Sequence, residues 1–112
     1  MEKNIMIGTL YQYYKDLLSE KQRASIEQYY IEDLSLTEIA EIQGVSKQAV
    51  STNIKRGETL LEEYEQKLKL YSRFNDVSNG LEELSALIYE NTDKQAYETI
   101  KEKISVLMSK LN

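Results

Sequence analysis

Apolar residues recur every three or four positions along most of the chain, which is the spacing of helices with one buried face. This pattern predicts a helix over residues 2–18, a second from Ser19 to about Glu32, and further helices from residue 36 to the end. Proline is absent and glycine occurs only four times. The chain is therefore predicted to be all-α. The residues expected to face inward in the first two helices are Met6, Leu10, Tyr13, Tyr14, Leu17, Leu18, Ile26, Tyr29 and Tyr30.

The stretch from Ser35 to Arg56 has the pattern of two short helices joined by a tight turn. Ser35 followed by Glu38 is a capping box, so the first helix should begin at residue 36. Gly44 stands where a helix ends with a positive φ, and Ser46 can cap the second helix. This is the pattern of a helix-turn-helix, whose second helix suits the major groove of DNA. The residues predicted to be buried are Leu36, Ile39, Ala40, Ile42, Ala49, Val50 and Ile54, with Val45 filling the corner between the helices.

The outward face of the second helix of this motif carries side chains that can contact DNA. Gln can pair with adenine, Ser and Thr can bond several base edges, and Lys can bind guanine or phosphate. Between Ile42 and Gly57 there are three cations and no carboxylate. A polar helix that merely faces solvent is the alternative interpretation. The predicted DNA-binding residues are Lys47, Gln48, Ser51, Thr52, Lys55 and Arg56.

Beyond the motif, a long helix is predicted to continue to about residue 74. Its residues Leu61, Tyr64, Leu68 and Tyr71 follow the 4-3 spacing of a coiled coil. Two heptads are few for a coiled coil, so packing of this helix on its own chain is an equal alternative. Asn, Asp, Ser and Gly then cluster over residues 75–80 and predict a loop.

This loop would separate a helix-turn-helix domain, residues 1–74, from a C-terminal helical hairpin, residues 75–112. The hairpin is expected to pack on the long helix or on a second subunit. More apolar positions are present on these helices than a small domain readily buries, which predicts a homodimer. The apolar residues of the two hairpin helices are Leu81, Leu84, Leu87, Ile88, Tyr97, Ile100, Ile104, Leu107 and Leu111.

Composition narrows the range of functions. The net charge of −5 and the pI near 4.8 argue against a general nucleic-acid binder, so any DNA contact should be local. Histidine and cysteine are absent, and no glycine-rich phosphate loop is present. We therefore expect no enzyme activity, no metal site and no cofactor. No signal-peptide core and no membrane-spanning run is found, which predicts a cytoplasmic protein.

The stretch LSEKQRASIEQYYIEDLSLTEIAEIQGVSKQAVSTNIKR resembles region 4 of bacterial sigma factors in its LxxxQR, LS, EIA and GVS elements. Together with the following GETLLEEYEQKLKLY, it is more closely similar to the YlxM-like family of small bacterial helix-turn-helix proteins associated with the signal recognition particle. This resemblance covers about residues 10–74. It implies a sigma-region-4-like helical domain with a helical extension, and a link to the protein-targeting pathway.

The sequence departs from the family pattern at Ser51 and Thr52, where a Tyr-Asp pair is usual, and at Gly57, where Thr is common. A DNA target therefore cannot be carried over from the family. Two hypotheses follow. The first is a DNA-binding regulator, and the second is a non-enzymatic adaptor for a protein or ribonucleoprotein partner in the protein-targeting machinery, such as a signal recognition particle component.

Overall fold

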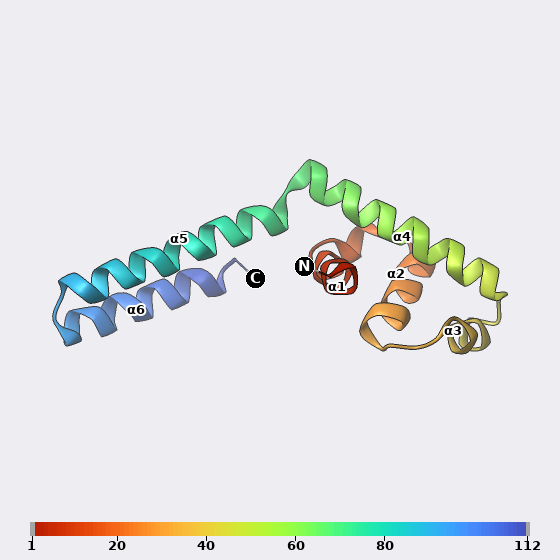
Figure 1. The fold of residues 1–112 in the computed structure, drawn as a ribbon, viewed down its shortest axis with the longest axis horizontal. Coiled ribbons are helices and arrows are strands. Elements are labelled where there is room, and N and C mark those ends of the chain that lie inside the picture. The colour runs from red at the N-terminus through yellow and green to blue at the C-terminus, as the bar shows by residue number, and fades with distance from the viewer. Residues whose placement is uncertain (1, 112) are drawn as a thin grey trace. The chain divides into compact units, whose positions relative to one another are not determined.

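The computed structural model describes residues 2–111, which form six α-helices and no strand (Figure 1). The prediction of an all-α protein is confirmed. None of the described helices is long and apolar enough to cross a membrane. The chain divides after Lys69 into two compact units, which are described separately. The helices are α1 (Lys3–Tyr14), α2 (Glu20–Ile26), α3 (Leu36–Gln43), α4 (Lys47–Leu68), α5 (Leu70–Asn91) and α6 (Lys94–Ser109), with a 3-10 turn at Lys15–Leu17 and a π-helical turn at Glu27–Ile31.

In the first unit, α1, α2 and α3 all pack against α4. The predicted capping box of α2 is present, because Ser19 Oγ accepts from the Gln22 backbone N–H while Gln22 Oε1 accepts from the Ser19 N–H. The apolar faces of the four helices meet in one core, as the predicted spacing requires. The buried apolar residues are Ile7, Leu10, Tyr11, Tyr14, Leu18, Ile26, Ile39, Ala40, Val50, Ile54 and Leu61.

Two of the four residues of the seam predicted on the long helix pack within this unit, whereas Leu68 is 43% exposed and Tyr71 lies in α5 of the second unit. Leu61 is fully buried, and Tyr64 packs on Tyr14 with ring centroids 6.0 Å apart. The Tyr64 hydroxyl also donates to the backbone oxygen of Leu17 at 3.3 Å. Leu61 and Tyr64 therefore pack on the core of their own chain, which is one of the two alternatives for the seam.

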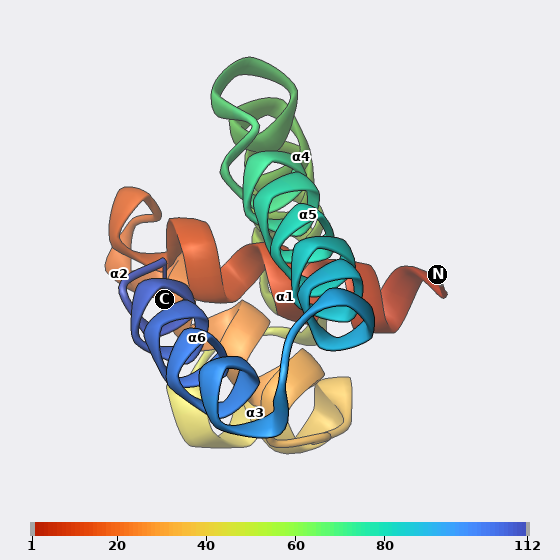
Figure 2. The ribbon, with the colours of Figure 1, turned by 90° about the vertical axis from the view of Figure 1, so that its left-hand side faces the viewer.

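The second unit is an antiparallel hairpin, in which α5 and α6 lie side by side (Figures 1 and 2). A tight connection at Thr92 and Asp93 joins them, and the Asp93 carboxylate caps α6 by accepting from the Ala96 backbone N–H. The two helices face each other through half-buried residues at three- and four-residue spacing. Ile104 is the one buried apolar side chain in the described part of this hairpin.

The prediction of a loop over residues 75–80 is wrong, because these residues are helical within α5. Asn75 and Ser78 are half-buried, as are Phe74 and Leu81 at helical spacing around them, and such packing outweighs low helix propensity. The helix break occurs earlier, at Lys69, which is left-handed with φ 57° and donates its N–H to Glu65 O. The predicted long helix to residue 74 therefore ends at Leu68.

Several residues predicted to be buried are exposed instead. Ile42 is 62% exposed, because the buried side of the short helix α3 centres between Ile39 and Ala40. Gln43 occupies the inward position at the end of α3, and its amide donates to Ser25 Oγ and Gln28 Oε1. The other exposed residues are Val45, at the corner of the motif, Leu17, in the 3-10 turn after α1 ends early, and Tyr29, in the π-helical turn.

Candidate nucleic-acid interface

The local structure of α3, the turn and α4 follows directly from its capping residues. Ser35 Oγ accepts from the Glu38 backbone N–H at 3.1 Å, and Glu38 Oε1 accepts from the Ser35 N–H at 3.0 Å. These hydrogen bonds lower the pKa of Glu38. Gly44 ends α3 with φ 67°, and Ser46 Oγ caps α4 by accepting from the Ala49 N–H at 3.1 Å. The predicted helix-turn-helix is therefore present, with α4 as its second helix.

The buried residues of α4 fix which side of this helix faces outward. Val50, Ile54 and Leu61 lie on one side and are buried against the other helices of the unit. At 100° per residue, Ser51 lies at the edge of the buried side, and Lys47 lies near that side but is exposed at the N-terminal end of the helix. Of the six predicted DNA-binding residues, the other four occupy the opposite half of the first three turns: Gln48, Thr52, Lys55 and Arg56. All six are neighbours at three- and four-residue spacing and form one continuous surface. Four are exposed (Lys47, Gln48, Lys55 and Arg56), and two are half-buried (Ser51 and Thr52).

The three cations of this surface keep their charge available for a ligand. Within residues 2–111, neither Lys47, Lys55 nor Arg56 forms an ion pair with another side chain. The first carboxylate that follows on α4 is Glu58, and its side chain is only 13% exposed. The outward half of the first three turns therefore carries positive charge without a neutralising carboxylate on the same helix.

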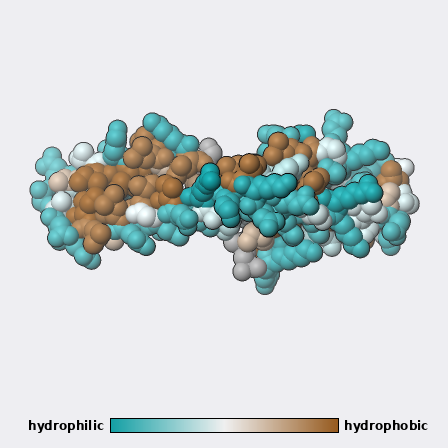
Figure 3. Space-filling view, turned by 90° about the horizontal axis from the view of Figure 1, so that it is seen from above, coloured by the Kyte–Doolittle hydropathy of each residue, from teal (hydrophilic) through white to brown (hydrophobic). Residues whose placement is uncertain are grey.

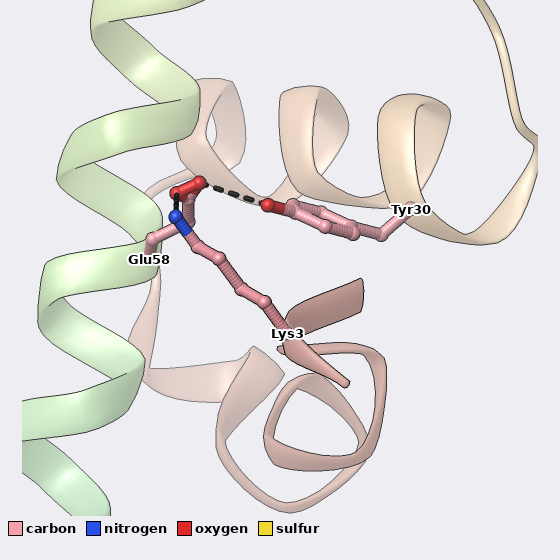
Figure 4. A network of polar contacts seen from close by, with 3 residues as sticks. All are labelled: Lys3, Tyr30 and Glu58. Atoms are coloured by element: carbon pink, nitrogen blue, oxygen red, sulfur yellow. Dashed lines mark hydrogen bonds and ion pairs between the residues drawn. The ribbon is translucent and has the colours of Figure 1, made fainter. Parts of the chain in front are cut away.

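Glu58 is held inward by residues from two other elements (Figure 4). The Tyr30 hydroxyl donates to Glu58 Oε1 at 2.8 Å, and Lys3 Nζ lies 3.4 Å from Oε2. Burial and the hydrogen bond to Glu58 raise the pKa of Tyr30. The same contacts tie α1 and the π-helical turn to α4, just beyond the candidate DNA-binding surface.

Two further tyrosine–glutamate pairs hold the platform beneath α4. The Tyr11 hydroxyl donates to Glu27 Oε2, and the Tyr14 hydroxyl donates to Glu65 Oε1, both at 2.6 Å. Burial, followed by the hydrogen bond to Glu27, raises the pKa of Tyr11 to about 12. The sequence patterns did not reveal these pairs, since the partners lie 16 and 51 residues apart and no local spacing links them.

Comparison with known proteins identifies a family and relatives of similar sequence. The model of the UPF0122 family, described as "Putative helix-turn-helix protein, YlxM / p13 like", matches residues 1–105. A UPF0122 protein of Oceanobacillus iheyensis is 46% identical over 101 residues, covering 90% of this chain and 93% of the relative. One of Halalkalibacterium halodurans is 45% identical over 109 residues, covering 97% and 94%. The similarity thus extends through α5 and most of α6, beyond the residues 10–74 that carry the resemblance in the sequence.

Proposed function

Because the chain belongs to the UPF0122 family of YlxM-like helix-turn-helix proteins, we propose that it is a DNA-binding regulator that reads the major groove with α4. The observation that carries this proposal is the outward half of the first three turns of α4, which is polar, cationic and free of carboxylates. A helix held from behind by a core and exposed in front suits insertion into the groove. The proposal places the protein in the cytoplasm, with the bacterial chromosome.

The side chains of this surface divide by chemistry into two roles. Gln48, Ser51 and Thr52 can bond to base edges and would give sequence preference. Lys47, Lys55 and Arg56 would contact phosphates and set the position of α4 on the duplex. The cap at Ser46 leaves the N-terminal end of α4 exposed beside Lys47, where the partial positive charge of the helix adds to phosphate attraction.

The acidic remainder of the protein makes the expected binding selective. The chain has a net charge of −5, so surfaces outside α4 repel the phosphate backbone on average. Non-specific binding should therefore be weak, and stable complexes should need base contacts in addition to three phosphate contacts.

Selection from a pool of random DNA duplexes tests this function. The full chain should enrich a short common sequence over successive rounds at low salt. The variant Lys47→Ala/Lys55→Ala/Arg56→Ala should enrich none, while circular dichroism shows an unchanged helical fold. If the native protein enriches no sequence, or if the triple variant enriches the same one, α4 is not the reading helix.

A second candidate function is an adaptor that binds a protein or ribonucleoprotein partner of the protein-targeting machinery. The net charge of the chain favours it, as do Glu38 and Glu41, which are exposed on α3 next to the turn of the motif. The resemblance to YlxM-like proteins makes a signal recognition particle component the partner to test. Co-purification with such a component, lost in Gln48→Ala/Lys55→Ala, would support the adaptor, and its absence would leave the regulator.

A further inference from the structure

The hairpin of α5 and α6 exposes a broad apolar surface. On α5, Val77, Leu84 and Leu87 lie at three- and seven-residue spacing and are all about half exposed. Figure 3 shows hydrophobic residues gathered in a continuous area over this unit. We define this area as the hairpin face. Its exposed members are Val77, Leu84 and Leu87 on α5 and Val106, Leu107 and Leu111 on α6.

The hairpin buries too little to be stable as a separate two-helix unit. Ile104, at 8% exposure, is the one apolar residue of its described part that is excluded from water. Isolated helices are marginal in water, and most of their stability in proteins comes from packing of an apolar face. Domains of about 40 residues usually need an additional constraint, such as oligomerisation. The hairpin face therefore requires a partner that is always present.

The size of the hairpin face matches a modest but stable protein interface. With 22 and 16 residues, α5 and α6 are about 33 and 24 Å long. At about 10 Å per helix, their common flat side covers about 600 Å². Two such sides would bury about 1,200 Å², the lower end of the range for specific interfaces.

Charge identifies the kind of partner. Residues 70–112 contain seven Asp or Glu and five Lys or Arg, so the unit is acidic and repels nucleic acid and anionic lipid. The exposed members of the hairpin face are apolar, and the two charged residues beside Val106, Glu102 and Lys103, have opposite signs. A copy of the face can therefore meet it without a net excess of like charge, as a two-fold interface requires. We propose that the hairpin face is a homodimer interface, in which two α5–α6 hairpins pack as a four-helix bundle.

A depression on the surface of α6 fits this arrangement. It is shallow and is lined by Thr99, Ile100 and Val106, with Glu102 and Lys103 also at its edge. Depressions of this kind receive side chains of a facing helix in knobs-into-holes packing. The proposal does not depend on DNA binding, because it involves none of the outward residues of α4.

Light scattering on the full chain at low and high micromolar concentration tests the proposal. The native protein should have twice the monomer mass of 13.1 kDa. Leu84→Glu/Leu87→Glu places two carboxylates in the interface and should weaken dimerisation by at least about a hundredfold, giving a monomer. Ala86→Glu is the matched control, since residue 86 is exposed about 200° around α5 from Leu84, and it should remain a dimer.

Circular dichroism distinguishes dissociation from general unfolding. The first unit has its own core, so the monomeric variant should keep the helicity of α1 to α4 while that of α5 and α6 decreases. The milder variant Leu84→Ser should form dimers that dissociate at lower concentration. A monomeric native protein would overturn the proposal. So would a dimer that persists unchanged in Leu84→Glu/Leu87→Glu.

Discussion

Ile26 of α2 packs directly against the backbone of α4 at Gly57. A Cβ added at Gly57 would lie 2.7 Å from Ile26 Cγ1, closer than real side chains approach. Both residues are buried. The glycine therefore does not break α4; it lets α2 cross the helix just after the proposed DNA-binding surface and holds that surface outward.

Gly57→Ala should destabilise the first unit although alanine favours helices. Overpacking a core costs about 1 to 3 kcal/mol. An added Cβ only 2.7 Å from Ile26 Cγ1 places this cost in the upper part of that range, above the gain in helix propensity of about 1 kcal/mol. Gly8→Ala is the matched control, because its Cβ would meet only Ile31 Cδ1 at an ordinary 3.8 Å, so it should stabilise α1. Urea denaturation measures both changes. Equal stabilisation by the two substitutions would show that α2 does not need this close approach.

Ser35→Ala should lower the free energy of unfolding by about 1 kcal/mol without changing the fold, because it removes the cap of α3. Thr37→Ala, on the exposed side of the same helix, should have little effect or stabilise slightly. Thermal melts followed by circular dichroism give both values. Indistinguishable melting temperatures for Ser35→Ala and the native protein would exclude the capping role.

The caps and the turn of the motif could be predicted because their signals are local. Ser35, Gly44 and Ser46 act within a few residues of their own positions, and the outward positions of Gln48, Thr52, Lys55 and Arg56 follow from the spacing of the buried side of α4. The break at Lys69 could not be predicted, because lysine has no preference for a positive φ. The helical conformation of residues 75–80 likewise depends on packing against α6. Helix propensity is a property of the local sequence and cannot predict such packing.

Raising the pH above 10 should destabilise the first unit through Tyr11. Its pKa rises from 10.0 to about 12 in the folded protein, so the neutral hydroxyl is favoured by folding. The contribution of the neutral Tyr11 hydroxyl to the free energy of unfolding is fully present below pH 10 and is lost as the pH rises toward 12. Tyr11→Phe should reduce the alkaline loss of stability, and Tyr89→Phe, on the exposed side of α5, should not. Urea titrations at pH 9 and about 11 compare them; an equal loss in Tyr11→Phe and native protein would contradict the assignment.

Gln48→Ala should relax base preference while leaving phosphate contacts in place. Each good paired contact to a base discriminates by about 1 to 3 kcal/mol. In Gln48→Ala, the difference in binding free energy between the selected duplex and a duplex with one base changed should therefore fall by about that much. Gln66→Ala, exposed near the end of α4, is the matched control and should bind like the native protein. Fluorescence anisotropy with both duplexes measures the difference. Unchanged discrimination in Gln48→Ala would remove this residue from the base-reading set.

The salt dependence of DNA affinity tests the central claim most directly. Each phosphate contact contributes about −0.9 to the slope of log affinity against log salt, so three cations predict about −3 per protomer. Lys55→Ala should reduce the slope by about one per protomer, whereas Lys67→Ala, an exposed cation in the last turn of α4, should leave it unchanged. A slope near zero, an equal effect of the two lysine variants, or no binding even at low salt would contradict DNA recognition by α4.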